Sequence, residues 1–433
     1  MPAKVALPPL RLGLAGLGTV GIGVVKIIQE HADLITARTG RRVTISAVSA
    51  RDPRKNRDAD LSTYAWESDP IALAKRDDVD VFVEVMGGHE GAAFDATYAA
   101  IAAGKDVVTA NKALLAHHGH ALAMAAESAG RVIRFEAAVA GGIPVIKVLT
   151  EGLASNQIRR VMGVMNGTCN YILTRMQDAG LPYESVFEEA RQLGYLEADP
   201  NLDVGGIDAG HKLSLLAAIA FGTQVAFDAV ELEGIGAISI DDINLAADMG
   251  YRIKLLGVAQ MTGRGLEQRM TPCLVPDNSP LGQLKGGTNM VVLDGDSAGQ
   301  VVLRGAGAGA GPTASAIMSD VLDIARGVRL PTFGQPAASL KTPVAAKTAT
   351  PAPYYLRMTL LDKPGALAKI ATALGEAGVS IDQMRQYRHE GANAPVLIVT
   401  HKATRADIDH AISQFSKTGV LVGMPVALRI EEI

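Results

Sequence analysis

The chain is poor in cysteine, in aromatic residues and in long apolar stretches, and each shortage excludes a class of protein. Its 433 residues include two cysteines, one tryptophan and only 4% aromatic residues. Two cysteines outside any CxxC pair build neither a disulfide framework nor a structural zinc cluster, which is typical of a reducing compartment. So few aromatic rings also leave little for stacking against single-stranded nucleic acid.

Charge and hydropathy exclude further classes. Lys and Arg number 41 against 45 Asp and Glu, for a net charge of −4, so the positive field of a nucleic-acid binder is lacking. No signal-peptide core precedes Arg11, and the apolar run LSLLAAIAFG after Lys212 is shorter than the ~20 residues needed to cross a bilayer. We expect a soluble cytoplasmic protein that binds neither nucleic acid nor membranes.

Glycine, by contrast, is abundant at 46 residues, which is typical of α/β nucleotide enzymes with tight turns and close approaches of backbone to ligand. At the start of the chain, β-rich runs alternate with helical patterns; the runs are residues 11–15, 43–48, 79–85 and 106–108. Strands that alternate with helices predict a parallel sheet. We interpret residues 1–135 as a Rossmann-type, doubly wound dinucleotide-binding domain.

The pattern changes from residue 136 onward. Helical patterns dominate residues 168–222, and strands of a mixed or antiparallel sheet are expected at 251–260, 288–293 and 300–303. Residues 136–311 therefore predict an α+β domain. Pro312 opens a further helical pattern, as proline does in a first helical turn, and we expect this helix, 312–330, to complete the first domain.

The C-terminal part reads as a separate small domain after a linker. Residues 335–353 hold clustered Pro, Ala and Thr without apolar periodicity, which predicts a linker. Residues 354–433 then show the order β-α-β-β-α-β, which predicts a ferredoxin-like fold.

A dinucleotide site is predicted by the first glycine-rich turn. GxGxxG alone is a weak pattern, but here it stands between a predicted strand and a predicted helix, which favours a cofactor site over a glycine-rich turn without function. Its glycines would let the backbone reach a pyrophosphate at the positive end of the helix dipole. The cofactor-binding residues of this turn are Gly16, Leu17, Gly18, Thr19 and Val20.

The end of the second strand bears on which dinucleotide binds. NAD-specific sites place a carboxylate there for the ribose 2′-hydroxyl, but this chain has Ser49 and Ala50, then Arg51, with Lys55 and Arg57 beyond. Guanidinium and ammonium groups suit a 2′-phosphate, so NADP(H) is favoured, with Arg51 as its contact. A solvated basic loop is the alternative, and use of NAD(H) stays open.

Three charged residues are candidates for the chemistry. Lys112 follows the predicted strand 106–108, at the carboxyl edge where α/β sheets bind ligands, although a lysine after a strand is often only a surface residue. Asp208 and Lys212 are four residues apart and share a helical face, the spacing of an ordinary ion pair. However, the helix beyond Lys212 is apolar nearly all round, which predicts burial, and a buried lysine needs a partner or a task.

These segments, in this order, resemble the homoserine dehydrogenase family. The matching stretches are the turn at 16–21, TANK at 109–112, EAAVAGGIP from Glu136, GVMNGTCNYIL from Gly163, GYLEADPNLDVGGIDAGHK from Gly194 and GAGAGAGPTASA from Gly305. Residues 354–433 resemble an ACT domain, a module that often senses amino acids. The resemblance spans nearly the whole chain.

The resemblance implies roles for individual residues. Lys212 would protonate the substrate's aldehyde oxygen as hydride arrives from the nicotinamide, and Lys112 would lie across the same oxygen, beside the cofactor. Glu197 and Asp208 would bind the substrate's ammonium group. The further residues that would approach the cofactor are Lys112, Gly194, Gly307 and Gly309.

Two more sites follow from the resemblance alone. Family members can carry a monovalent cation, Na⁺ or K⁺, on backbone carbonyls; the matching positions are Glu136, Val139, Gly141 and Ile143. In an ACT domain the first strand-to-helix turn helps to bind an effector, here threonine; the matching positions are Asp362, Pro364, Gly365 and Ala366. A plain turn in a dimerisation domain is the alternative for this second site.

The implied activity is the NAD(P)H-dependent, reversible reduction of L-aspartate 4-semialdehyde to L-homoserine, on the path to threonine, methionine and isoleucine. Residues 136–311 would then bind the substrate, and feedback control would act through the ACT domain. A homodimer or homotetramer is expected. The alternatives are a dehydrogenase of another small amino-acid-derived aldehyde and an amino-acid sensor without catalytic activity.

Overall fold

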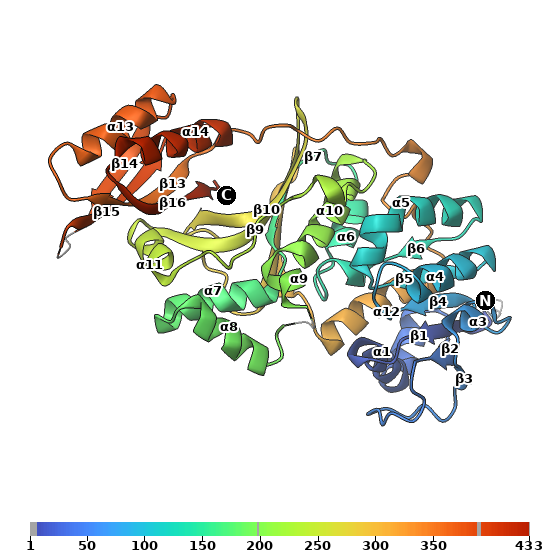
Figure 1. Cartoon of the computed structure of the whole chain (residues 1–433). Helices are drawn as coiled ribbons and strands as arrows, with labels where there is room; N and C mark the ends of the chain where they lie inside the picture. Colours follow the sequence, from blue (N-terminus) through green and yellow to red (C-terminus); the bar gives the residue numbers. More distant parts are fainter. Residues whose placement is uncertain (1–6, 197–198, 388–390, 433) are drawn as a thin grey trace.

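The computed structural model describes residues 7–196, 199–387 and 391–432 and shows three regions along the chain (Figure 1). The N-terminal region carries a parallel sheet, the middle region a mixed sheet with helices, and the C-terminal region a small α/β unit. Every helix within the described residues is too short or too polar to cross a lipid bilayer.

The N-terminal sheet has six strands in the order β3-β2-β1-β4-β5-β6, and all its paired strands are parallel. Its strands are β1 (Leu10–Ala15), β2 (Val43–Ser49), β3 (Ala65–Glu67), β4 (Val81–Glu84), β5 (Asp106–Thr109) and β6 (Ile133–Arg134). Its helices are α1 (Thr19–Glu30), α2 (Ala32–Thr39), α3 (Pro70–Lys75), α4 (Ala92–Ala102) and α5 (Lys112–Ser128). The strand order reverses between β1 and β4, which is where doubly wound sheets bind their ligands. The Rossmann-type prediction is confirmed.

Helix α12 (Ala310–Arg326) returns from the far end of the middle region and packs against α1. Ala314, Ile317 and Val321 of α12 share one buried cluster with residues of β1 and α1. The approach is close, because a Cβ at Gly23 of α1 would stand 2.9 Å from the carbonyl oxygen of Ala310. The return of α12 brings the segment before it, 305–309, to the dinucleotide fold.

The middle region builds a second sheet and most of the remaining helices. Its strands are β7 (Ile158–Val164), β8 (Glu231–Leu232), β9 (Tyr251–Thr262), β10 (Gly265–Pro276), β11 (Thr288–Gly295) and β12 (Gly299–Ala306). Its helices are α6 (Val145–Lys147), the π-helical turn η2 (Val148–Gly152), α7 (Gly167–Ala179), α8 (Tyr183–Gln192), α9 (Pro200–Val204), α10 (Ile207–Phe221) and α11 (Ile240–Asp248), and short 3₁₀ turns lie at η1 (Glu136–Ala138) and η3 (Phe227–Ala229). Helix α10 is buried over most of its length and contacts β7, β9, β10 and α5.

Strand β10 was not predicted from the sequence, and its composition explains why. Glu267, Gln268 and Arg269 follow one another in its middle, yet all three are buried. A run of polar residues breaks the apolar alternation by which a strand is recognised. Much of the cost of burying them is offset by partners. Arg269 forms ion pairs with Glu267 and Glu431, Gln260 of β9 donates to Glu267, and Gln268 donates to the carbonyl oxygen of Ala226.

The C-terminal region has the predicted βαββαβ order and the ferredoxin-like strand arrangement β16-β13-β15-β14. Its elements are β13 (Tyr354–Leu361), α13 (Ala366–Glu376), β14 (Ile381–Gln386), β15 (Asn393–Thr400), α14 (Arg405–Phe415), the 3₁₀ turn η5 (Ser416–Thr418) and β16 (Leu421–Ile430). Strand β16 also pairs in parallel with β10, with Cys273 opposite Arg429 and Leu274 opposite Ile430. This pair joins the sheets of the middle and C-terminal regions into one sheet of ten strands.

The residues predicted as a linker run across the top of the middle region (Figure 1). They hold one short 3₁₀ turn, η4 (Ala337–Ser339). Isolated bridges join Lys341 to Thr223 and Ala345 to Leu266. The segment is therefore an extended connection that is fastened to the domain it crosses.

A buried ion network around Glu431 connects the C-terminal region to the middle region, in addition to the pairing of β16 with β10. Glu431 is 3% exposed and forms ion pairs with Arg160, Arg269 and, at 2.7 Å, Arg429. Burial alone would raise the pKa of Glu431, but the charges of Arg269, Arg160 and Arg429 outweigh burial and lower it. Two of the three arginines belong to the middle region, so this carboxylate joins the two regions.

Candidate active site

The glycine-rich turn has the shape of a dinucleotide cradle. Gly16 has φ +108°, and a Cβ there would stand 2.5 Å from the carbonyl oxygen of Val85; at Gly21 it would stand 2.0 Å from the carbonyl oxygen of Gly16. Gly18 is the N-cap of α1 and supplies no side-chain cap, and no heavy atom lies within 4 Å of the place of its Cβ. The turn thus leaves open space beside free backbone N–H groups, which suits a pyrophosphate.

The loop after β2 brings basic side chains to this turn. Arg51 and Lys55 are exposed. Arg57 instead donates to the carbonyl oxygens of Leu17, at 3.2 Å, and Asp52, at 2.8 Å. Arg57 therefore fixes the loop on the glycine turn and leaves Arg51 and Lys55 available to a ligand.

Lys112 is placed by a buried carboxylate at the carboxyl edge of the parallel sheet. Glu84, at the end of β4, accepts a hydrogen bond from Thr109 Oγ1 at 2.6 Å, and burial raises the pKa of Glu84. Asn111 caps α5 with its side-chain oxygen and donates from Nδ2 to the carbonyl oxygen of Gly88 at 2.5 Å. Lys112 is the next residue, so its position follows from these polar contacts.

Asp208 joins the two candidate lysines. Its Oδ1 lies 2.8 Å from Lys112 Nζ and its Oδ2 lies 2.7 Å from Lys212 Nζ, which also donates to the carbonyl oxygen of Met165 at 3.0 Å. The side chains of Asp208 and Lys212 are 8% and 10% exposed. Burial alone would raise the pKa of Asp208, but the ammonium groups of Lys212 and Lys112 outweigh burial and hold that pKa far below its usual range.

This geometry does not favour the alternative interpretations, a surface lysine at position 112 and an ordinary ion pair between Asp208 and Lys212. An exposed ion pair at i,i+4 is worth a few tenths of a kcal/mol. Here Asp208 and Lys212 are both buried, and the carboxylate of Asp208 also binds Lys112 of the N-terminal region. The three groups carry a net charge of +1 at the meeting of α5 and α10. Such a cluster can stabilise negative charge that develops on a substrate oxygen and supply it with a proton.

Sequence reasoning missed Asn166, a polar residue beside this cluster. Asn166, the N-cap of α7, donates from Nδ2 to Asp203 Oδ1 at 3.0 Å and to Asp208 Oδ2 at 3.5 Å. The buried Cys169 donates to the carbonyl oxygen of Asp203 at 3.3 Å, and burial raises the pKa of its thiol. An asparagine ahead of a helix pattern signals a cap, but nothing local shows that this cap reaches another segment.

Of the remaining residues predicted to bind cofactor or substrate, Glu197 lies outside the described residues. Gly194 forms an exposed turn after α8 with φ +75°. Gly307 lies tightly against Asn289, whose Nδ2 would stand 1.9 Å from a Cβ at Gly307. Gly309 has φ +118° and is the N-cap of α12.

The positions matched to a monovalent cation lie in one buried turn. Glu136, Val139, Gly141 and Ile143 are all buried, and Gly141 has φ +56°. The carboxylate of Glu136 accepts the N–H groups of Ile146 and Lys147 at 2.9 and 2.8 Å. Burial and the neighbouring Asp320 raise the pKa of Glu136 to about 7.

Three histidines lie close to the lysine cluster. The ring centroids of His89 and His117 are 4.4 Å apart, and those of His117 and His211 are 5.6 Å apart. Burial, followed by the charge of His117, lowers the pKa of His211 to about 4. Among the residues that the structure describes, no group of three His, Cys, Asp or Glu side chains is arranged to hold a metal ion.

The predicted effector turn is open at the start of α13. Gly365 is the N-cap of this helix, has φ +82° and supplies no side-chain cap. Asp362, Pro364 and Gly365 are exposed, while Ala366 is buried. The uncapped N–H groups suit a carboxylate, and the same shape serves a plain turn.

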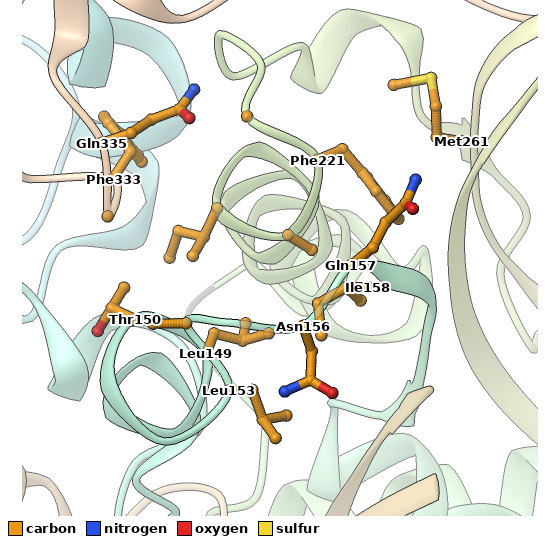
Figure 2. Close-up of a pocket in the computed structure, with 15 residues that line it drawn as sticks. Leu149, Thr150, Leu153, Asn156, Gln157, Ile158, Phe221, Met261, Phe333 and Gln335 are labelled. Carbon is orange, nitrogen blue, oxygen red and sulfur yellow. The ribbon is translucent and has the colours of Figure 1, made fainter. Parts of the chain in front are cut away.

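The structure also contains a cavity of about 350 Å³ away from this cluster, at the other end of α10 (Figure 2). Figure 2 shows Leu149 and Thr150 of the π-helical turn on one side and Phe221, Met261 and Gln335 on the other. No lining residue carries a charge. A zwitterionic substrate needs a carboxylate for its amine and a proton donor for its carbonyl oxygen, so this cavity does not suit one.

Comparisons with known proteins show the family to which the chain belongs. Models of the homoserine dehydrogenase NAD-binding domain, of homoserine dehydrogenase and of the ACT domain match residues 16–136, 144–322 and 354–419. A homoserine dehydrogenase from Neisseria gonorrhoeae is 41% identical over 435 residues, which cover 99% of this chain and 100% of the relative. The chain belongs to the homoserine dehydrogenase family.

Other members of the homoserine dehydrogenase family give the same result. The enzyme from Pseudomonas aeruginosa is 40% identical over 99% of this chain and 100% of its own. A solved homoserine dehydrogenase from Thiobacillus denitrificans matches with a TM-score of 0.92 and 38% identity over 98% of each chain. The present chain is thus an oxidoreductase of amino-acid biosynthesis that acts on a CH–OH group with a nicotinamide cofactor, and the predicted family and enzyme class are confirmed.

Proposed function

We propose that Lys212 is the general acid that protonates the aldehyde oxygen of L-aspartate 4-semialdehyde, and the base that removes the proton from L-homoserine in reverse. The observation that carries this proposal is the single carboxylate, Asp208, that binds the ammonium groups of both Lys212 and Lys112. The nicotinamide supplies the hydride when it is bound. The chain's own residues supply the proton, the charge and the orientation.

Lys112 is the electrostatic partner in this proposal. It begins α5 directly after the sheet edge that also carries the glycine turn, so it lies between the cofactor side and the lysine–aspartate cluster. Its ammonium stabilises negative charge on the substrate oxygen. Asp208 fixes both lysines and, with Glu197, receives the substrate's ammonium group.

We further propose that NADP(H) is the preferred cofactor, with Arg51 at the 2′-phosphate. The absence of a carboxylate after β2 and the exposed Arg51 and Lys55 support this preference. A hyperthermophilic archaeal homoserine dehydrogenase solved in complex with NADPH matches this chain with a TM-score of 0.63 and 25% identity over 76% of it. NAD(H) would bind at the same turn without the phosphate contact.

Initial rates with L-aspartate 4-semialdehyde test this preference. Arg51→Ala is expected to raise KM for NADPH about tenfold and to leave KM for NADH nearly unchanged, because only NADPH loses a charge-assisted contact. Arg54→Ala, an exposed neighbour, serves as the control. Equal changes in KM for the two cofactors would contradict the assignment of Arg51.

Threonine is proposed to inhibit the enzyme through the turn before α13. Asp362→Ala is expected to raise the threonine concentration for half inhibition by about tenfold. Without threonine, kcat is expected to stay unchanged, because α13, which this turn precedes, lies far from α10, which carries Lys212 (Figure 1). Lys363→Ala, the exposed neighbour, is the control. An unchanged threonine response in D362A would contradict the effector site. Deletion of residues 354–433 is a poorer test, because it also removes Glu431 from Arg160 and Arg269.

A homodimer or homotetramer remains the proposed assembly. One edge of the ACT sheet, β16, is already paired with β10, and β14 is the terminal strand at the other edge. Edge-to-edge pairing of two ACT sheets would therefore have to use β14.

We also propose a cytoplasmic location, which the composition supports. A monovalent cation is proposed from the family resemblance, at Glu136, Val139, Gly141 and Ile143.

A further inference from the structure

Asn289 is a buried residue that touches the peptide holding Lys212. It lies on β11, is 2% exposed, and donates from Nδ2 to the carbonyl oxygen of Met165 at 3.1 Å. The same carbonyl oxygen accepts the hydrogen bond from Lys212 Nζ at 3.0 Å. One acceptor thus carries both the ammonium group and the amide of Asn289.

The other half of the Asn289 amide is unsatisfied. Within the part of the chain that the structure describes, its Oδ1 is buried and has no hydrogen-bond partner. An unpaired buried acceptor is unfavourable, and an apolar side chain of similar shape would avoid it. The feature that asparagine adds at this position is therefore its N–H donor, which is directed at Met165.

Asn289 also supports the glycine loop before α12. Its Nδ2 would stand 1.9 Å from a Cβ at Gly307, so the loop and the amide are in direct contact. A Cβ at Gly141 would in turn stand 2.5 Å from the carbonyl oxygen of Gly307. The side chain lies between the loop expected to approach the cofactor and the peptide that holds the acid.

The position of Asn289 is itself well fixed. The next residue, Met290, pairs with Val164 of β7, next to Met165. Asn170 of α7 donates to the carbonyl oxygen of Gly286 at 2.7 Å and holds the segment before β11. These contacts give the amide a rigid base on two elements.

We propose that Asn289 is a positioning residue for the reaction: it holds the Met165 carbonyl in the direction of Lys212 and sets the ammonium group against the Gly305–Gly309 loop. This inference rests on the proposed role of Lys212 as the acid. Asn289 acts through Met165 and has no proton-transfer role of its own.

The test compares Asn289→Ala and Asn289→Asp with the unchanged enzyme in the full chain. N289A removes the donor, and N289D keeps the shape but offers the carbonyl no amide N–H. We expect kcat for semialdehyde reduction to fall about 10- to 100-fold, as misplacement of a reacting group does, with KM for NADPH within about twofold. In N289A the alkaline limb of the pH–rate profile is expected to move to lower pH, because an ammonium group that loses an oriented acceptor gives up its proton more easily. In N289D the limb is expected to move to higher pH, because the new carboxylate favours the charged form of Lys212.

Asn156→Asp is the matched control. Asn156 uses its Oδ1 to accept the N–H of Ala298 at 2.8 Å, a role that a carboxylate keeps, and it lies on the far cavity. Its kcat and pH profile are expected to stay as in the unchanged enzyme. Should N289A fail to fold, N289D still provides kcat, Tm and a shift of the alkaline limb, which is of opposite sign.

Two results would overturn the role of Asn289: a kcat within twofold of the unchanged enzyme, or a loss of kcat with an unmoved alkaline limb and a lowered Tm, which is the pattern of a packing defect. Lys212→Ala is measured alongside. Normal turnover in K212A would refute the proposed acid itself, whereas collapse of K212A with normal N289A and N289D would refute only the positioning role.

Discussion

Lys212→Ala is expected to lower kcat for the reduction of L-aspartate 4-semialdehyde by about 10²- to 10⁴-fold, the usual contribution of a positioned general acid. The developing alkoxide would lose its proton donor, while Lys112 would still offer positive charge from the other oxygen of Asp208. KM for NADPH is expected to change by less than about twofold, because the glycine turn and Arg51 lie on another domain. Steady-state rates with saturating semialdehyde and a titration of NADPH fluorescence measure the two effects.

Two further variants sharpen the test of Lys212. Lys212→Arg keeps the charge but donates a proton poorly at neutral pH, so it is expected to remain impaired. Lys285→Ala, at an exposed lysine beside Asp178, is expected to behave like the unchanged enzyme. If K212A turned over normally, or if NADPH affinity fell as far as kcat, Lys212 would not be the acid.

Glu431→Ala is expected to destabilise the protein by about 3–5 kcal/mol, the usual cost of removing one partner from a buried ion pair. Arg160, Arg269 and Arg429 would be left without their shared carboxylate, two of them nearly buried. A domain of about 150–250 residues, such as the middle region, loses about 2–4 °C in Tm per kcal/mol. Tm should therefore fall by at least ~6 °C. Scanning calorimetry of the full chain measures the change.

The neighbouring residue gives a matched control for Glu431. The Glu432 side chain forms an exposed ion pair with Lys402, at 3.3 Å, and its backbone carbonyl, which alanine keeps, accepts a hydrogen bond from Arg160. Glu432→Ala is therefore expected to change stability by less than about 1 kcal/mol. Equal Tm values for E431A and the unchanged enzyme would show that the network does not stabilise the junction of the two regions.

The pH dependence of the Glu431 effect follows from its lowered pKa. Folding lowers this pKa from 4.5, so the stability that Glu431 contributes is fully present above that pH. It is lost as the pH falls through the lower value in the folded protein. The difference in Tm between E431A and the unchanged enzyme should therefore be constant near neutral pH and narrow only below about pH 4.5.

Much of the fold could be predicted because short local sequence patterns identify many of its helices and strands. The glycine turn between β1 and α1, the strands β4 and β5, and the βαββαβ order of the ACT domain all follow from short-range patterns of apolar residues, glycine and proline. Strand β10 could not be found in this way, since Glu267, Gln268 and Arg269 interrupt its apolar pattern. Its burial depends on partners from distant segments.

The sequence by itself determined the glycine cradle of the cofactor and the pairing of Asp208 with Lys212, because turn geometry and helical spacing act over only a few residues. Tertiary structure alone decided that Lys112 shares this carboxylate, that Asn289 reaches the peptide behind Lys212, and that β16 extends the sheet of the middle region. Each of these contacts joins segments far apart in the chain. Which segments meet is decided by packing and strand register over the whole molecule, and no local pattern encodes that.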